Sequence, residues 1–280
     1  MSTMRHTDPV LPVLEARGLR LHLADRAGAR WFRKAPRLEI LRGIDLSVAQ
    51  GETIGVVGES GSGKTTLGRT LLRLYEPTDG SLRFEGQDIT HAREERLRPM
   101  RARMQCIFQD PLSSLNPRHR IEDIVAQPLL SFGLVRDRSE ARGRARQLLE
   151  RVQLSQSFAL RYPHELSGGQ RQRVGIARAI AASPKLVIAD EIVSGLDVST
   201  QAQILMLLRE IRAETALVFI SHDLSVVRAL CDRVLVMHRG VVVEQGATDA
   251  VFARPEHDYT RDLLASIPLP ERDPNWIGSA

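Results

Sequence analysis

The sequence is poor in several kinds of residue, and each shortage excludes a class of protein. Its 280 residues include two cysteines, Cys106 and Cys231, which are too few for a four-cysteine metal site or a disulfide framework. No stretch approaches the roughly 18 apolar residues that a membrane-spanning helix needs. Residues 1–12 lack the apolar core of a secretory signal. These absences predict a protein that stays in the cytoplasm and reaches a membrane only through partner subunits.

Lysine is scarce as well, whereas arginine is common. The net charge is +5, but the positive side chains are spread along the chain, and only three of them are lysines. No basic run is long enough to form an arm that binds nucleic acid. We therefore expect no nucleic-acid partner.

Short β-branched and apolar runs alternate along the chain with helical patterns. The runs predict strands at residues 13–23, 40–48, 53–57, 81–84, 185–189, 216–220, 234–237 and 241–244. The helical patterns lie at residues 64–75, 139–152, 201–214, 224–231 and 247–252. This order predicts an α/β fold with a mixed sheet and crossover helices. We expect a main domain at residues 1–255, a mainly helical subdomain inserted at about residues 93–181, and a C-terminal tail at residues 256–280.

A glycine-rich loop separates the strand predicted at residues 53–57 from the helix that follows it. The loop reads Gly58, Glu59, Ser60, Gly61, Ser62, Gly63, Lys64, Thr65 and Thr66. It matches G-x-x-x-x-G-K-[ST], the phosphate-binding loop, in the strand–loop–helix context that the motif requires. Small residues let backbone N–H groups wrap a phosphate, and the helix N-terminus adds partial positive charge. Lys64 can reach the β- and γ-phosphate oxygens and Thr65 can offer its hydroxyl to Mg²⁺, so the loop predicts binding of ATP with Mg²⁺.

Two carboxylates follow the apolar strand predicted at residues 185–189. Asp190 would lie beside the phosphate loop and hold Mg²⁺, directly or through water. Glu191 is placed to act as general base toward the attacking water. Without the phosphate loop, the better interpretation of this pair would be two solvated acids at the start of a loop.

A second glycine-rich segment resembles the signature of a known protein family. It reads Leu166, Ser167, Gly168, Gly169 and Gln170, and it resembles L-S-G-G-Q, the signature of the ATP-binding cassette (ABC) family. The resemblance runs from about residue 13 to residue 268 and implies the P-loop NTPase fold of an ABC cassette, with an inserted helical subdomain. It also implies that Ser167, Gly168 and Gly169 open a helix whose N-terminus binds the γ-phosphate held by a second copy of the domain.

Other landmarks of this family follow in order along the chain. The resemblance makes Gln109 the residue that senses Mg²⁺ and water and that links the core to the helical subdomain. It makes Asp197 part of the loop that crosses the dimer interface, and His222 the switch histidine that contacts the γ-phosphate. Catalysis would then fall to Glu191, His222 and Gln109, and Mg²⁺ would be held by Thr65, Gln109 and Asp190.

The residue that stacks on adenine is less clearly marked. In this family it is usually an aromatic residue upstream of the second strand, and both Trp31 and Phe32 fit that description. We prefer Phe32, with packing in the core or contact with a partner as the alternative.

Two positions depart from the usual pattern of the family. Ile192 follows Glu191 where proline is usual, and Gly195 stands in the interface loop where alanine is usual. Neither change removes a group that contacts phosphate. A loosened Glu191 would slow turnover, so a nucleotide-binding partner with little hydrolysis of its own stays an alternative.

Three segments resemble the dipeptide, oligopeptide and nickel importer branch of the family. They are residues 108–117, residues 197–203 and a tail motif that includes His257, Tyr259 and Thr260. The resemblance implies an ATPase that drives import of dipeptides or oligopeptides from the cytoplasmic face of the bacterial inner membrane. Its partners would be two membrane-spanning permease subunits, a second ABC ATPase and, indirectly, an extracytoplasmic solute-binding protein.

Two further alternatives remain at this point. The solute could be a nickel complex or another small molecule, because the branch includes both kinds of importer. A soluble ABC ATPase of DNA repair or translation fits less well, since those proteins usually carry two cassettes or a long coiled-coil insertion, and this sequence has neither.

Overall fold

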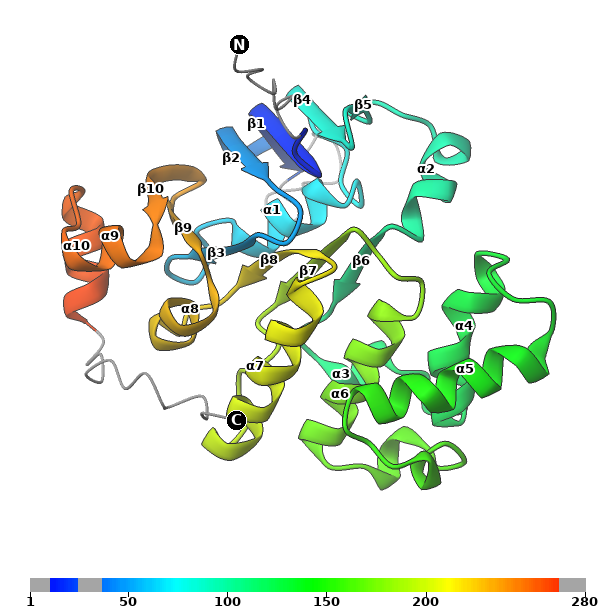
Figure 1. The fold of residues 1–280 in the computed structure, drawn as a ribbon. Coiled ribbons are helices and arrows are strands. Elements are labelled where there is room, and N and C mark those ends of the chain that lie inside the picture. Colours follow the sequence, from blue (N-terminus) through cyan, green and yellow to red (C-terminus); the bar gives the residue numbers. More distant parts are fainter. Residues whose placement is uncertain (1–10, 25–36, 267–280) are drawn as a thin grey trace, which may run out of the picture.

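The structure is a computed structural model that describes residues 11–24 and 37–266. Its strands form two sheets, and its helices lie between the sheets and around them (Figure 1). Trp31 and Phe32, the two candidates for stacking on adenine, lie outside the described residues, as does the end of the tail from residue 267.

Within the described residues, the central sheet has six strands in the order β10-β9-β3-β8-β7-β6. Their bounds are β10 (Val241–Ala247), β9 (Arg233–His238), β3 (Thr53–Val57), β8 (Ala216–Ile220), β7 (Leu186–Asp190) and β6 (Met104–Ile107). Neighbouring strands from β9 to β6 are parallel, whereas β10 is antiparallel to β9. All residues of β3 and β8 are buried, as expected of parallel strands covered on both faces. The expected α/β fold with a mixed sheet is therefore confirmed.

A second sheet is entirely antiparallel and has the order β2-β1-β4-β5. Its strands are β2 (Arg37–Val48), β1 (Leu14–Ala24), β4 (Asp79–Phe84) and β5 (Gln87–Asp88). Glu85 and Gly86 turn the chain between β4 and β5 with positive φ angles of 48° and 75°, as a tight hairpin requires. The second half of β2 alternates buried and exposed residues, which is the pattern of a strand with one solvated face.

The helices include every one that the sequence predicts. They are α1 (Lys64–Leu71), α2 (Glu94–Arg101), α3 (Pro111–Ser114), α4 (Ile121–Ser131), α5 (Arg138–Arg151), α6 (Gly168–Ile180), α7 (Val198–Arg212), α8 (Leu224–Leu230), α9 (Thr248–Ala253) and α10 (Asp258–Ala265), with 3₁₀ turns η1 (Gln156–Phe158) and η2 (Pro163–Glu165). Helix α1 ends before the predicted residue 75, because Arg73 adopts a positive φ of 54°. None of the described helices is both long enough and apolar enough to pass through a bilayer.

The central sheet separates two apolar cores. Val218 and Ile220 of β8 face the core that contains Leu67 of α1 and the buried side of the second sheet. Leu217 and Phe219, which alternate with them, face the core built with α6, α7 and α8. Figure 1 shows α1 between the two sheets, where it packs against β2 on one side and β7 and β8 on the other.

Helices α3, α4, α5 and α6 pack together in the part of the chain predicted to form the helical subdomain (green in Figure 1). The sequence analysis missed one strand in this range. β6 pairs with β7 in the central sheet, and its four residues include the polar Gln105, so no clear alternation marked it. The bounds of the inserted subdomain stay a prediction.

Candidate functional site

The phosphate loop joins β3 to α1 and encloses a buried cation. Lys64 is 5% exposed, and its ammonium donates hydrogen bonds to the carbonyl oxygens of Gly58 (2.7 Å) and Glu59 (2.8 Å). Burial lowers the pKa of Lys64, while the carboxylates of Glu191, Asp190 and Glu59 raise it. The loop therefore holds a positive charge against its own carbonyls, where phosphate oxygens can replace them as partners.

Two glycines allow the loop to approach neighbouring strands closely. A Cβ added to Gly58 would lie 2.1 Å from the carbonyl oxygen of Met237 in β9. Gly63 is the N-cap of α1 with a φ of 104°, and its added Cβ would lie 3.3 Å from the carbonyl oxygen of Ile40 in β2. Both positions favour glycine for two reasons: a Cβ would approach backbone atoms too closely, and the positive φ would be strained for any other residue.

Thr65 and Asp190 meet at one end of the central sheet. Thr65 lies in the first turn of α1 and Asp190 is the last residue of β7, and Thr65 Oγ1 donates to Asp190 Oδ1 over 3.2 Å. Burial raises the pKa of Asp190, and the hydrogen bond from Thr65 lowers it. A hydroxyl and a carboxylate are suitable oxygen ligands for Mg²⁺. No group of three or more His, Cys, Asp or Glu side chains in the described part of the chain could hold a metal ion.

Of the three residues predicted to be catalytic, Gln109 and His222 both lie against the carboxylate of the third, Glu191. Gln109 Nε2 donates to Glu191 Oε2 over 2.8 Å, and His222 Nδ1 lies 3.5 Å from Glu191 Oε1. Gln109 follows β6, Glu191 follows β7 and His222 follows β8, so three adjacent strand ends supply them. The side chain of Glu191 is 20% exposed and that of His222 is 59% exposed, which leaves both accessible to substrate.

The backbone at Glu191 is unusual. Its φ is 49°, in the left-handed region, which costs a non-glycine residue about 1–2 kcal/mol. The amide of Glu191 donates to the carbonyl of Ile220 (2.9 Å), and its carbonyl accepts from the amide of Ser194 (3.2 Å). The next residue, Ile192, is 1% exposed and packs in the core, so it fixes the chain beside the carboxylate.

The signature residues begin α6. The amide of Gln170 donates to Ser167 Oγ (3.3 Å), and the amide of Ser167 donates to Gln170 Oε1 (2.9 Å), which together form a capping box. Gly169 approaches α7 so closely that an added Cβ would lie 2.3 Å from Cγ2 of Thr200. Among the described residues, no hydrogen bond joins Ser167, Gly168 or the two residues after them to the phosphate loop.

Asp197 caps the next helix, α7. Its carboxylate accepts from Ser199 Oγ (2.5 Å), the Thr200 amide (2.9 Å) and Thr200 Oγ1 (2.8 Å). These hydrogen bonds hold the pKa of Asp197 well below its usual value, and the bond from Ser199 has the largest effect. The cap explains why α7 begins at residue 198, before the predicted residue 201.

Comparison with known proteins decides the family. The model of a protein family described as "ABC transporter" matches residues 41–194, which is more than half of the chain. The chain belongs to the ABC transporter family. The chain is therefore an ABC-type ATPase, and the residues that the phosphate loop, β7 and β8 bring together are its candidate ATP site.

Several relatives of this ABC cassette have names that refer to peptide import or oligopeptide transport. A putative peptide import ATP-binding protein of Brucella ovis is 47% identical over 264 residues, which are 94% of this chain and 80% of the relative. An oligopeptide transport ATP-binding protein of Bacillus subtilis is 47% identical over 92% of this chain and 78% of its own length. An oligopeptide transport ATP-binding protein of Escherichia coli is 45% identical over 93% of this chain and 79% of its own length.

Solved structures of other ABC cassettes share the fold. A dimeric ATP-binding cassette in a post-hydrolysis state, bound to ADP and Pi, has a TM-score of 0.74 and 27% sequence identity, covering 84% of this chain and 98% of its own. The cassette cbiO1 of Clostridium perfringens, part of an ABC transporter complex, has a TM-score of 0.71 and 28% identity, covering 88% of this chain and 92% of its own.

A small cavity lies beside the candidate ATP site of this ABC cassette. Its volume is about 180 Å³, and it is lined by Val193, Ser194, Gly195, Leu196, Gln201, Ser221, His222 and Asp223. The cavity connects His222 with the loop that caps α7, so it belongs to the same site.

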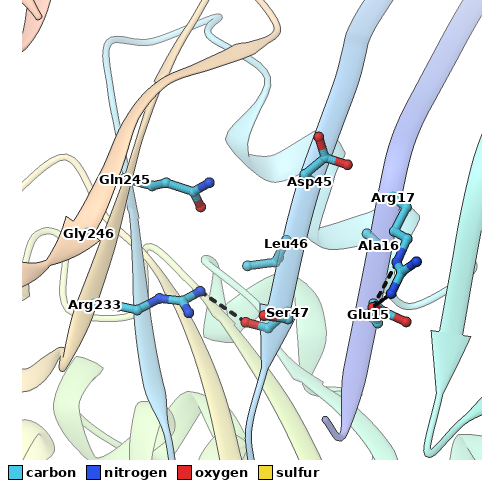
Figure 2. Close-up of a pocket in the computed structure, with 9 residues that line it drawn as sticks. All are labelled: Glu15, Ala16, Arg17, Asp45, Leu46, Ser47, Arg233, Gln245 and Gly246. Atoms are coloured by element: carbon cyan, nitrogen blue, oxygen red, sulfur yellow. Dashed lines mark hydrogen bonds and ion pairs between the residues drawn. The ribbon is translucent and has the colours of Figure 1, made fainter. Parts of the chain in front are cut away.

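A larger cavity of about 540 Å³ lies apart from the ATP site, between β1 and β2 on one side and β9 and β10 on the other (Figure 2). Its two arginines already have partners: Arg17 pairs with Glu15, and Arg233 donates to the carbonyl oxygen of Ser47 over 3.0 Å. None of the described residues predicted for the ATP site lines it. The larger cavity therefore does not coincide with the candidate ATP site.

One contact of the ATP site was missed by the sequence analysis. The hydroxyl of Tyr259 in α10 accepts a hydrogen bond from the amide of Glu59 over 3.0 Å. The tail motif named Tyr259 only as a mark of the importer branch, and no spacing in the sequence connects it to the phosphate loop.

Proposed function

We propose that this chain is the ATP-hydrolysing subunit of a bacterial importer of dipeptides or oligopeptides. Relatives that are 45–47% identical over more than nine-tenths of the chain carry names of peptide import or oligopeptide transport, which supports this solute class. The subunit works at the cytoplasmic face of the inner membrane with two permease subunits. A solute-binding protein outside the membrane delivers the peptide to the permease and does not touch this chain.

The convergence of Gln109 and His222 on Glu191 carries the hydrolytic part of the proposal. The Glu191 carboxylate accepts a proton from the water that attacks the γ-phosphate, as a general base does. Gln109 orients that carboxylate through its 2.8 Å hydrogen bond. His222 lies on the other side of the carboxylate and contacts the γ-phosphate, so both neighbours fix the base in position.

Thr65, Asp190 and Gln109 would hold Mg²⁺. The 3.2 Å contact between Thr65 and Asp190 brings a hydroxyl and a carboxylate to the first turn of α1, which fits the preference of Mg²⁺ for oxygen ligands. When bound, Mg²⁺ neutralises part of the charge on the phosphates. Lys64 and the backbone amides of the phosphate loop supply the rest of the positive field.

A second cassette is needed to complete the site. Ser167 is exposed at the N-terminus of α6, and within the described ranges no hydrogen bond connects it to the phosphate loop of its own chain. A helix N-terminus favours a negatively charged group, so Ser167, Gly168, Gly169 and Gln170 are suited to a γ-phosphate held by another copy or a related chain. The dimeric state of the similar solved cassette supports this arrangement, in which Asp197 lies at the interface.

The variant Glu191→Gln tests hydrolysis. It keeps the size of the side chain and the backbone at residue 191, and it removes the base, so we expect kcat for ATP to fall by about 10²–10⁴-fold while ATP still binds. Glu210→Gln, on the exposed side of α7, is the matched control and should hydrolyse ATP at the normal rate. Unchanged turnover with Glu191→Gln in the assembled transporter would instead favour a nucleotide-binding partner without hydrolysis of its own.

Uptake measurements test the solute. Cells that carry Lys64→Ala in place of the normal chain should lose uptake of labelled dipeptide and of a longer peptide, because the loop loses the cation that holds the phosphates. Uptake of nickel should remain. Loss of nickel uptake with normal peptide uptake would favour the alternative solute.

A further inference from the structure

A side chain from the described part of the tail contacts the phosphate loop. The amide of Glu59 donates a hydrogen bond to the hydroxyl of Tyr259 in α10 over 3.0 Å, although the two residues are 200 positions apart. Glu59 follows the first glycine of the loop. The partner of its amide, Tyr259, belongs to neither the loop nor the central sheet. The tail thus takes part in the geometry of the ATP site.

Tyr259 is held in place by contacts that do not involve its hydroxyl. Its ring stacks on the ring of His238, the last residue of β9, with centroids 4.1 Å apart and planes 10° from parallel. Glu244 in β10 accepts hydrogen bonds from the amides of Glu256 (2.9 Å) and His257 (3.1 Å), which fastens the start of α10. Removing the hydroxyl alone should therefore leave α10 docked.

The same peptide segment that meets Tyr259 also meets the phosphate-binding cation. The carbonyl of Glu59 accepts from the ammonium of Lys64 over 2.8 Å, while its amide donates to Tyr259. Two hydrogen bonds thus connect the tail hydroxyl to the ammonium through one loop residue. A shift of Glu59 would move a partner of Lys64, so the hydroxyl acts on the phosphate contact through the backbone.

The hairpin between β9 and β10 supports the other side of the loop. The amide of Gly240 donates to the carbonyl of Ser62 over 3.0 Å, and Gly58 lies against the carbonyl of Met237. His238, on which Tyr259 stacks, belongs to this same hairpin. The hairpin and the tail therefore form one support behind the phosphate loop.

We infer that Tyr259 is a positioning residue of the ATP site, which fixes the start of the phosphate loop through Glu59 and so links docking of α10 to nucleotide binding. The inference concerns the ATP site and is independent of which solute is imported. Burial raises the pKa of Tyr259, so its phenol stays protonated at neutral pH and offers the amide a neutral acceptor. Nucleotide and tail then stabilise the same loop geometry, and their effects are reciprocal.

Calorimetric binding of ADP with Mg²⁺ to the full chain tests the inference. Tyr259→Phe keeps the ring on His238 and removes one neutral hydrogen bond, so we expect the Kd for ADP to rise about 2- to 12-fold. The thermal midpoint without nucleotide should stay within about 2 °C of the normal value, because Glu244 still holds α10. Tyr75→Phe is the matched control: it removes a hydroxyl that accepts from Arg69 on the exposed surface, and its Kd should not change.

Hydrogen exchange supplies a second readout that a purely structural role would not produce. In the normal chain, exchange of the α10 amides should slow when ADP binds, because the loop and the tail stabilise each other. In Tyr259→Phe, ADP should leave that exchange unchanged.

An unchanged Kd for ADP in Tyr259→Phe would overturn the inference. If the thermal midpoint were lowered at the same time, Tyr259 would have a structural role alone. Failure of the normal chain to bind ADP would be a different result, because it would reject the ATP site itself.

Discussion

Replacing Gly58 with alanine tests whether β9 fixes the phosphate loop. The added Cβ would lie 2.1 Å from the carbonyl oxygen of Met237, and the φ of Gly58, 143°, is one that side chains rarely adopt. The opposing atom belongs to the backbone of a central strand, so no rotation of a side chain can relieve the overlap. The chain offers two comparison sites, Gly61 and Gly143, where the overlap is absent.

The three glycines separate overlap from backbone strain. Gly61 has a φ of 80° and no neighbour within 4 Å, so Gly61→Ala should destabilise the fold by strain alone, about 1–2 kcal/mol. Gly58→Ala adds the effect of overpacking, about 1–3 kcal/mol, for a total of about 2–5 kcal/mol. Gly143 lies in α5 with open space around it, so Gly143→Ala should stabilise the chain by about 0.5–1 kcal/mol.

Thermal unfolding without nucleotide measures these differences. For a domain of this size, 1 kcal/mol shifts Tm by about 2–3 °C. Gly58→Ala should then lower Tm by about 4–15 °C, Gly61→Ala by about 2–6 °C, and Gly143→Ala should raise it by about 1–3 °C. If Gly58→Ala and Gly61→Ala melt within about 1 °C of each other, contact with β9 does not constrain the loop, and the reasoning is refuted.

Two further predictions concern a partly buried thiol and a buried guanidinium outside the phosphate loop. Burial raises the pKa of Cys106 to about 12, so little of the reactive thiolate forms at pH 8. Iodoacetamide at this pH should therefore leave Cys106 unmodified in the folded chain and alkylate it after unfolding, as measured by mass spectrometry. Rapid labelling of the folded chain would contradict this prediction. Arg173, which is 8% exposed, donates to the carbonyl of Val152 (3.1 Å) and to Gln203 Oε1 (2.6 Å). Arg173→Met should therefore lower the free energy of unfolding in urea by about 1–3 kcal/mol, whereas the exposed Arg144→Met should change it by less than about 1 kcal/mol.

Elements specified by adjacent residues could be predicted from the sequence. The strand at residues 216–220 has the bounds expected from its apolar run, because every residue of β8 is buried and the run carries its own signal. The phosphate loop was predicted between a strand and a helix because its glycines, Lys64 and Thr65 are contiguous and match one motif. Helix bounds were less accurate, since Arg73 ends α1 through its φ and Asp197 starts α7 through a cap.

Contacts between distant segments could not be predicted from spacing. β6 is too short to show a period, and only its pairing with β7 defines it as a strand. Gln109 and His222 were assigned to one site with Glu191 by family resemblance, since their meeting depends on the order of β6, β7 and β8 in the sheet. The bond between Tyr259 and Glu59 depends on where α10 docks, which no local pattern specifies.

The left-handed backbone at Glu191 sets the proposed activity of its carboxylate against the stability of the fold. Glycine would adopt a φ of 49° without an energetic penalty, yet it would supply no carboxylate. The chain therefore has glutamate at a position where the backbone conformation favours glycine. β-Branched residues are excluded there for the same steric reason. The backbone conformation therefore limits which residues can occupy position 191, whatever chemistry their side chains would supply.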